Sequence, residues 1–265
     1  MALFQINYHS AALARSADFY ALIPNDTPKE WEKVNPCYGR PPKTLMLLHG
    51  YSGSAGDWLY GSPIQELSLK YNLAVVMPSG DNTFYLNGRG TGRAYETYVG
   101  EELIGYVRET FDLSKRAEDT YIAGLSMGGY GALHTAFKYP LTYGKAVGLS
   151  SALIVEQLGH MTPEDENPMA DYDYYTETFG DLKNAEKSDI NPKVLVRKLQ
   201  EQGTKLPGIF MACGTEDFLI EPNRNFRDFL IGRGIPVCYY ESAGVHDWTF
   251  WREYLEPAIQ WMLEE

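Results

Sequence analysis

The sequence predicts an α/β fold in which a mostly parallel sheet is covered by helices on both faces. From residue 43 onward, short apolar segments alternate with longer segments whose apolar residues recur every three or four positions, as in repeated strand–helix units. The apolar segments 45–48 and 74–77 contain no polar residue, which is typical of strands buried on both faces. The 265 residues are 44% hydrophobic and 22% charged, within the range of one globular domain.

Two further strands are expected at the N-terminus, where Phe4, Ile6 and Tyr8 alternate with polar neighbours and residues 17–23 form a second apolar stretch. The remaining strands are predicted at 45–48, 74–77, 120–123, 145–149, 208–212 and 237–241, and the helices at 62–70, 99–111, 127–138, 223–231 and 248–263. Residues 152–205 interrupt this alternation. We interpret them as an insertion that forms a small cap above a single domain, 1–265.

The net charge of −12 at pH 7 argues against nucleic acid or an anionic membrane surface as a partner, because both carry phosphate groups. Residues 162–189 carry nine acidic and two basic side chains, which we interpret as a solvated outer face. No apolar run approaches the 18 residues of a membrane-spanning helix. Three scattered cysteines and an N-terminus without a signal-peptide pattern favour a reducing compartment, so we expect a cytoplasmic protein.

The segment Gly124–Gly128, with the sequence Gly-Leu-Ser-Met-Gly, carries the strongest chemical signal. It lies between a predicted strand and a predicted helix, the context in which Gly-x-Ser-x-Gly forms a sharp turn that exposes the serine hydroxyl. The first amides of the helix, that of Met127 among them, would stabilise a developing oxyanion. We therefore predict that Ser126 is a nucleophile; a glycine-rich packing turn is the alternative.

A serine nucleophile needs a histidine base and a carboxylate, which follow it in the chain in the order serine, acid, histidine. Of the five histidines, only His246 lies on a loop after the last predicted strand. Glu216 and Asp217 both follow the preceding strand, and the Gly-x-x-Asp turn favours Asp217. The alternatives are a helix-capping role for Asp217 and a surface or capping role for His246, while Asp247 is expected to cap the last helix.

A second oxyanion donor is expected from the loop after strand 45–48. This loop begins with His49-Gly50-Tyr51-Ser52. Gly50 lets the backbone approach a ligand, and the amide of Tyr51 is the expected donor; a plain turn is the alternative. Substrate contacts are expected from Ser52, Tyr85 and Trp248, although core packing is the commoner role of such aromatic residues.

Together, these motifs resemble the esterase D family of α/β-hydrolases over nearly the whole chain. The resemblance is carried by Leu47-Leu48-His49-Gly50, Ala123-Gly-Leu-Ser-Met-Gly-Gly-Tyr-Gly131, Gly214-Thr-Glu-Asp217 and His246-Asp-Trp248. The segment around the serine is most similar to the branch of tributyrin, feruloyl and acetyl esterases. Gly50–Gly53 and Leu125 differ from the Gly-Leu-Thr-Cys loop and the histidine of the S-formylglutathione hydrolase branch, which points away from glutathione thioesters.

The resemblance implies an α/β-hydrolase fold with a small insertion over the active site, and a serine carboxylesterase that needs no metal or cofactor. Ser126 would attack the ester, His246 would take its proton, Asp217 would orient the imidazole, and the amides of Met127 and Tyr51 would hold the oxyanion. The expected partner is a small-molecule ester, and a homo-oligomer is compatible with the sequence.

Short acyl groups are expected, because Tyr51 and Trp248 should narrow the site and the insertion shows no long amphipathic helix of the kind found in lipase lids. Three alternatives remain open. They are a feruloyl or acetyl-xylan esterase acting on plant polysaccharide fragments, an acyltransferase with the same three residues, and a binding module of this fold without activity.

Overall fold

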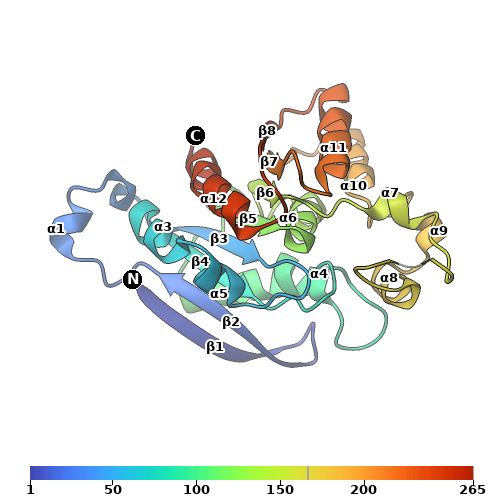
Figure 1. Cartoon of the computed structure of the whole chain (residues 1–265). Coiled ribbons are helices and arrows are strands. Elements are labelled where there is room, and N and C mark those ends of the chain that lie inside the picture. Colours follow the sequence, from blue (N-terminus) through green and yellow to red (C-terminus); the bar gives the residue numbers. More distant parts are fainter. Residues whose placement is uncertain (166, 265) are drawn as a thin grey trace.

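In the computed structural model, which describes residues 1–165 and 167–264, an eight-stranded sheet lies between two layers of helices (Figure 1). The strand order is β1-β2-β4-β3-β5-β6-β7-β8. β1 and β2 run antiparallel to their neighbours, and all pairs from β4 to β8 are parallel. The predicted fold class is therefore confirmed.

The strands are β1 (Ala2–Ser10), β2 (Arg15–Ile23), β3 (Lys43–Leu48), β4 (Leu73–Pro78), β5 (Thr120–Leu125), β6 (Lys145–Leu149), β7 (Gly208–Gly214) and β8 (Cys238–Ser242). The helices are α1 (Lys29–Glu32), α2 (Asp57–Gly61), α3 (Ile64–Tyr71), α4 (Tyr95–Thr97), α5 (Leu103–Thr110), α6 (Met127–Lys138), α7 (Val155–Leu158), α8 (Tyr172–Phe179), α9 (Leu182–Ala185), α10 (Pro192–Glu201), α11 (Ile220–Gly232) and α12 (Trp248–Leu263). A π-helical turn, η2 (Tyr98–Glu102), precedes α5, and 3₁₀ turns occur at η1 (Pro36–Gly39) and η3 (Ala117–Asp119).

Alternate residues of the central strands face opposite helical layers. In β3, Met46 and Leu48 pack in one buried cluster and Leu45 and Leu47 in the other, as expected when successive side chains point to opposite faces. Helices α5, α6, α10 and α11 cover the first face, and α3 and α12 cover the second. Burial on both faces explains why these strands contain runs of apolar residues.

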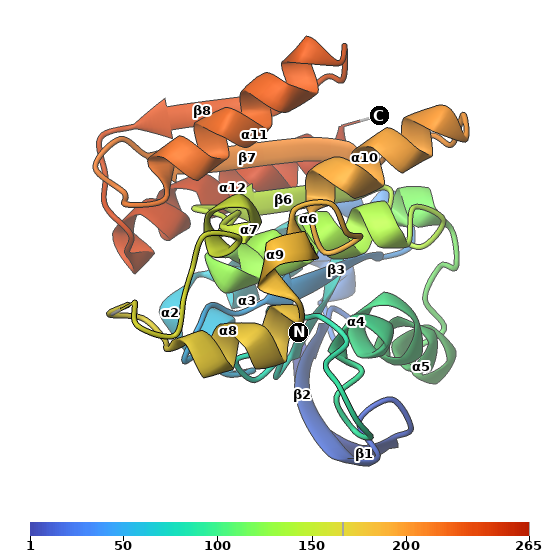
Figure 2. The ribbon, with the colours of Figure 1, turned by 90° about the vertical axis from the view of Figure 1, so that its right-hand side faces the viewer.

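One helix of the predicted insertion, 152–205, belongs to the layer that covers the sheet. Helix α10 buries Leu195, Val196 and Leu199 in the cluster that also contains α6. It therefore covers the sheet, and the cap is restricted to the residues of the insertion that precede α10. Figure 2 shows α7, α8 and α9 together at the front of the molecule, on the side toward which the β3 arrow points in Figure 1.

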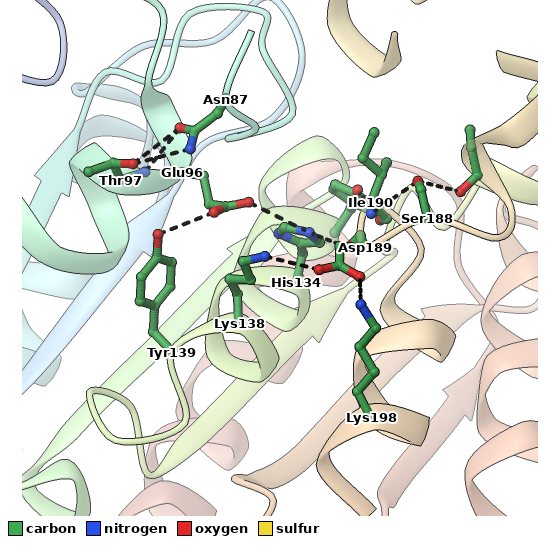
Figure 3. A network of polar contacts seen from close by, with 12 residues as sticks. Asn87, Glu96, Thr97, His134, Lys138, Tyr139, Ser188, Asp189, Ile190 and Lys198 are labelled. Atoms are coloured by element: carbon green, nitrogen blue, oxygen red, sulfur yellow. Dashed lines mark hydrogen bonds and ion pairs between the residues drawn. The ribbon is translucent and has the colours of Figure 1, made fainter. Parts of the chain in front are cut away.

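The end of the cap is anchored on α6, the helix that follows Ser126. The Tyr130 hydroxyl donates to the Ile190 carbonyl (2.6 Å), and the buried His134 ring donates from Nε2 to the Asp189 carbonyl (2.9 Å). Lys138 and Lys198 both form ion pairs with the Asp189 carboxylate (Figure 3). These contacts connect the cap to the helix behind the predicted nucleophile.

We expect the protein to lose stability as the pH falls from about 6.5 to about 4. Burial lowers the pKa of His134 to about 4, whereas an unfolded histidine titrates near 6.5. In this interval the unfolded chain binds a proton that the folded chain does not, so the free energy of unfolding falls with pH, by about 3 kcal/mol in total for this residue. The His134 ring also faces Lys138, Asp189 and Glu96; the Glu96 Oε2 atom lies 3.9 Å from His134 Nε2.

Urea unfolding between pH 4 and pH 7 measures this effect. His134→Gln keeps an N–H donor but does not titrate, so its stability should fall less steeply than that of the parent protein. Equal slopes for the two proteins would contradict the prediction.

Candidate active site

Ser126 occupies a strained turn between β5 and α6. Its φ of 53° and ψ of −118° are unusual for a residue with a side chain. The turn is held on both sides, because the Ser126 amide donates to the Leu149 carbonyl and its own carbonyl accepts from the Ala152 amide, each at 2.9 Å. A Cβ at Gly124 would lie less than 3.0 Å from the Gly128 carbonyl. The turn therefore requires glycine where the motif has it.

The loops after β7 and β8 bring the predicted acid and base to this serine. His246 Nε2 lies 2.9 Å from Ser126 Oγ, and His246 Nδ1 lies 2.8 Å from Asp217 Oδ2. A carboxylate only accepts hydrogen bonds, so Nδ1 carries the proton and Nε2 is free to accept from the serine hydroxyl. This tautomer is the one that a general base needs.

The Asp217 side chain is fully buried beneath the His246 ring. Burial alone would raise the pKa of Asp217, but hydrogen bonds from His246 and from the Leu219 amide (2.8 Å) outweigh it and hold this pKa below its usual range. The carboxylate is therefore charged at neutral pH.

Glu216, the alternative acid, holds the histidine loop instead. Its Oε2 accepts from the Gly244 amide (2.7 Å), and its own amide donates to the Gly244 carbonyl (3.1 Å). The hydrogen bond from Gly244 lowers the pKa of Glu216. The two adjacent carboxylates thus have different partners: Asp217 contacts the His246 ring, and Glu216 holds the loop that carries this histidine. As expected, Asp247 caps α12 by accepting from the Phe250 amide.

The amide of Tyr51 is oriented by the carbonyl that shares its peptide unit. The Gly50 carbonyl accepts from His49 Nδ1 (2.7 Å) and from the Gly53 amide (3.1 Å). In a trans peptide the N–H points away from the carbonyl, so the Tyr51 N–H points away from the His49 ring. Among the described residues, neither this amide nor that of Met127 has a hydrogen-bond partner, and both residues line a cavity with Ser126.

This cavity has a volume of about 500 Å³ and extends from Ser126 beneath the cap. The core side is lined by Tyr51, Phe84, Ser126, Met127, Ala152, Ile154, Phe218 and Leu219, and the cap side by Gln157, Leu158, His160, Met161, Asp165, Asn167, Pro168, Met169, Tyr174 and Tyr175. The Phe218 ring is 64% exposed and lies 4.6 Å from the His246 ring, centroid to centroid. Sequence reasoning predicted that the insertion lies over the active site, but it did not predict which of its residues reach the cavity.

The three predicted substrate contacts lie outside this cavity. The prediction is wrong for Tyr85, which is fully buried and donates its hydroxyl to the His49 carbonyl. Ser52 is exposed at the surface. Trp248 packs edge-on against Trp58 and Trp251 and lines a separate groove, so it does not narrow the cavity as expected.

Within residues 1–165 and 167–264, no group of three or more His, Cys, Asp and Glu side chains could hold a metal ion. Nor does any helix described there have the length and apolar character needed to cross a membrane.

The fold and its strand-end site define an α/β-hydrolase, and comparisons with known proteins identify a carboxylic ester hydrolase. The chain belongs to the family described as "Putative esterase", whose model matches residues 25–262. An acetyl esterase of Caldicellulosiruptor saccharolyticus is 42% identical over 263 residues, which cover 99% of this chain and 98% of that protein.

Solved structures of serine hydrolases match the whole chain. Fluorophosphonate-binding serine hydrolase F of Staphylococcus aureus superposes with a TM-score of 0.84 at 28% identity, covering 100% of this chain and 99% of that one. An S-formylglutathione hydrolase of the same organism gives a TM-score of 0.82 at 28% identity, with 99% of both chains covered. A ferulic acid esterase shares the fold at 20% identity, with a TM-score of 0.73 over 98% of this chain and 96% of that one.

Proposed function

We propose that this esterase is a serine carboxylesterase in which Ser126, His246 and Asp217 form a catalytic triad. The observation that carries the proposal is the unbroken hydrogen-bonded chain from Ser126 Oγ through the imidazole to the buried Asp217 carboxylate. In the first step, His246 takes the serine proton as Oγ attacks the ester carbonyl, and the tetrahedral oxyanion accepts from the amides of Tyr51 and Met127.

Collapse of this intermediate releases the alcohol, which receives its proton from His246, and leaves an acyl group on Ser126. His246 then takes a proton from water, whose oxygen attacks the acyl carbonyl. The second tetrahedral intermediate expels Ser126 Oγ, which recovers its proton, and the free acid leaves. Asp217 stabilises the imidazolium in both steps without taking up a proton itself.

For the substrate, we propose short-chain acyl esters, acetyl to butyryl. The 42% identical relative named an acetyl esterase supports this choice. A second candidate is an aromatic acyl group such as feruloyl. The observation that favours it is the cavity of about 500 Å³, whose wall includes the rings of Tyr51, Phe84, Tyr174 and Tyr175.

We also propose that the chain belongs to the tributyrin, feruloyl and acetyl esterase branch of the esterase D family.

Replacing Ser126 with alanine should abolish turnover and leave the fold intact, since the change removes only the attacking oxygen. The expected loss in kcat is about 10⁴- to 10⁶-fold. A fluorophosphonate probe with mass-spectrometric mapping should label Ser126 in the parent protein and leave Ser126→Ala unlabelled. Labelling at another residue, or ordinary turnover by the variant, would overturn the assignment.

The neighbouring carboxylates provide a matched pair of variants. Asp217→Asn should lower kcat by about 10⁴-fold, because an amide does not enforce the Nδ1–H tautomer or stabilise the imidazolium. Glu216→Gln keeps an oxygen that can accept from the Gly244 amide and should stay within about tenfold of the parent, since Glu216 acts on the loop only. Steady-state kinetics with p-nitrophenyl acetate distinguishes the two, and equal losses would contradict separate roles.

Acyl-length preference is tested with p-nitrophenyl esters of two to twelve carbons, measured below any micelle concentration, with methyl butyrate and methyl ferulate alongside. For short acyl groups, kcat/KM should rise by a factor of up to about four for each methylene buried, which corresponds to about 0.8 kcal/mol, and should then fall before eight carbons. A maximum at eight carbons or beyond would exclude the short-chain proposal. A higher kcat/KM for methyl ferulate than for methyl butyrate would favour the second candidate.

A further inference from the structure

We propose that Asn82 is a positioning residue for the oxyanion hole, which holds the Tyr51 amide in place and ties its loop to cap helix α8. This inference rests on the function proposed above. Asn82 lies on the loop after β4, it does not line the cavity, and it touches none of the three triad residues by a hydrogen bond among the described residues. Its effect is exerted through Ser52 and Tyr174.

The first link is a hydrogen bond to a strained residue. The Ser52 amide donates to Asn82 Oδ1 at 2.7 Å, and Ser52 has a φ of 60°, in the left-handed region that residues with a side chain seldom occupy. Such a conformation persists only when surrounding contacts hold it. Without the Asn82 side chain, Ser52 would lose a partner that favours this conformation and could relax toward a negative φ.

The second link follows from the geometry of the peptide chain. Tyr51 lies between two peptide units, one with the Gly50 carbonyl and one with the Ser52 amide. The Gly50 carbonyl is held by His49 and Gly53, and the Ser52 amide is held by Asn82. Because each peptide unit is planar, the hydrogen bonds to the Gly50 carbonyl set the direction of the Tyr51 N–H, and the hydrogen bond from the Ser52 amide holds the Tyr51 Cα, where the two units meet. Asn82 thus supplies the second of the two constraints.

The third link connects this loop to the cap. The Tyr174 hydroxyl of α8 donates to the Asn82 backbone carbonyl at 2.8 Å. The Tyr174 ring packs edge-on against the Tyr51 ring, with centroids 5.5 Å apart and planes at 82°. Burial raises the pKa of Tyr174, so its hydroxyl keeps the proton that it donates. The oxyanion loop (residues 49–53), the loop after β4 and the cap therefore each contact the other two, through Tyr51–Tyr174, Tyr174–Asn82 and Asn82–Ser52.

A positioning role predicts a defect in turnover with little change in KM. Removing an oxyanion donor costs about 10²- to 10³-fold in kcat; an amide that is present but poorly held should cost less, and we expect Asn82→Ala to lower kcat about 10- to 100-fold. KM for p-nitrophenyl acetate should stay within about threefold, because the cavity wall is unchanged. Asn82→Asp keeps the accepting oxygen and should be several-fold faster than Asn82→Ala.

Asn87→Ala is a matched control. The Asn87 side chain also accepts from a backbone amide, that of Thr97, at 3.2 Å (Figure 3), and Asn87 is exposed. Its loss removes the same kind of hydrogen bond without touching the oxyanion loop. We expect parental kcat from Asn87→Ala, and thermal unfolding of both alanine variants shows whether a loss of kcat accompanies a loss of stability.

A boronic acid inhibitor distinguishes a defect in the oxyanion hole from a general loss of active-site structure, because it forms a tetrahedral anion on a serine nucleophile. For butylboronic acid, Asn82→Ala should raise the inhibition constant by about the factor by which kcat falls, and Tyr174→Phe should raise it in the same direction by less. If Ser126→Ala is inactive and Asn82→Ala keeps parental kcat and inhibition, this inference is overturned while the proposed triad stands. If Ser126→Ala remains active, both are overturned.

Discussion

The active site depends on the contact between α6 and the end of β3, where two backbones meet without an intervening side chain. A Cβ at Gly128 would collide with the carbonyls of Leu48 and His49. This close approach places the first turn of α6 beside the loop that begins at His49, so the amides of Met127 and Tyr51 come from two segments that are joined by packing alone. The glycines of the motif are therefore selected by backbone contact with β3 as well as by the turn at Ser126.

The electrostatics of the site follow from the same arrangement of strand ends. Parallel strands bring their carboxyl ends to one edge of the sheet, where loops carry catalytic groups in folds of this class. Here the loops after β7 and β8 bury the Asp217 side chain and leave the His246 side chain 19% exposed. The buried charge is balanced by two donors, whereas the ring above it can exchange protons with a substrate. The acid thus keeps its charge because of these donors, and the base is accessible because it lies nearer the surface.

The sequence was sufficient to predict the strands, the loops after β7 and β8 and the three hydrogen-bonded residues, because each of these is a local pattern. The bounds of α6 and α12 agree with the prediction because both helices begin at clear signals, the turn at Ser126 and the cap at Asp247. Helix α2 was not predicted, because its five residues are too few to show a helical period. Tyr85 was misjudged because an aromatic residue near a loop looks the same in sequence whether it faces a ligand or the core.

What the sequence could not predict is the part of the site built from long-range contacts. The Ser52 amide is held by Asn82, 30 positions further along the chain. The cap contacts α6 through the backbone carbonyls of Asp189 and Ile190, and because every residue has such a carbonyl, the residue types do not indicate these contacts. This division has a physical basis. The predicted catalytic groups lie on strand ends fixed by the buried core. The outer cavity wall belongs to an acidic cap, which is held by hydrogen bonds, by ion pairs and by the burial of Val155, Tyr175 and Phe179 in the core. Substitutions in the cap can therefore change the shape of the cavity at little cost to the sheet, provided that the contacts of Tyr174 and Asp189, which tie the cap to the reacting end of the site, are kept.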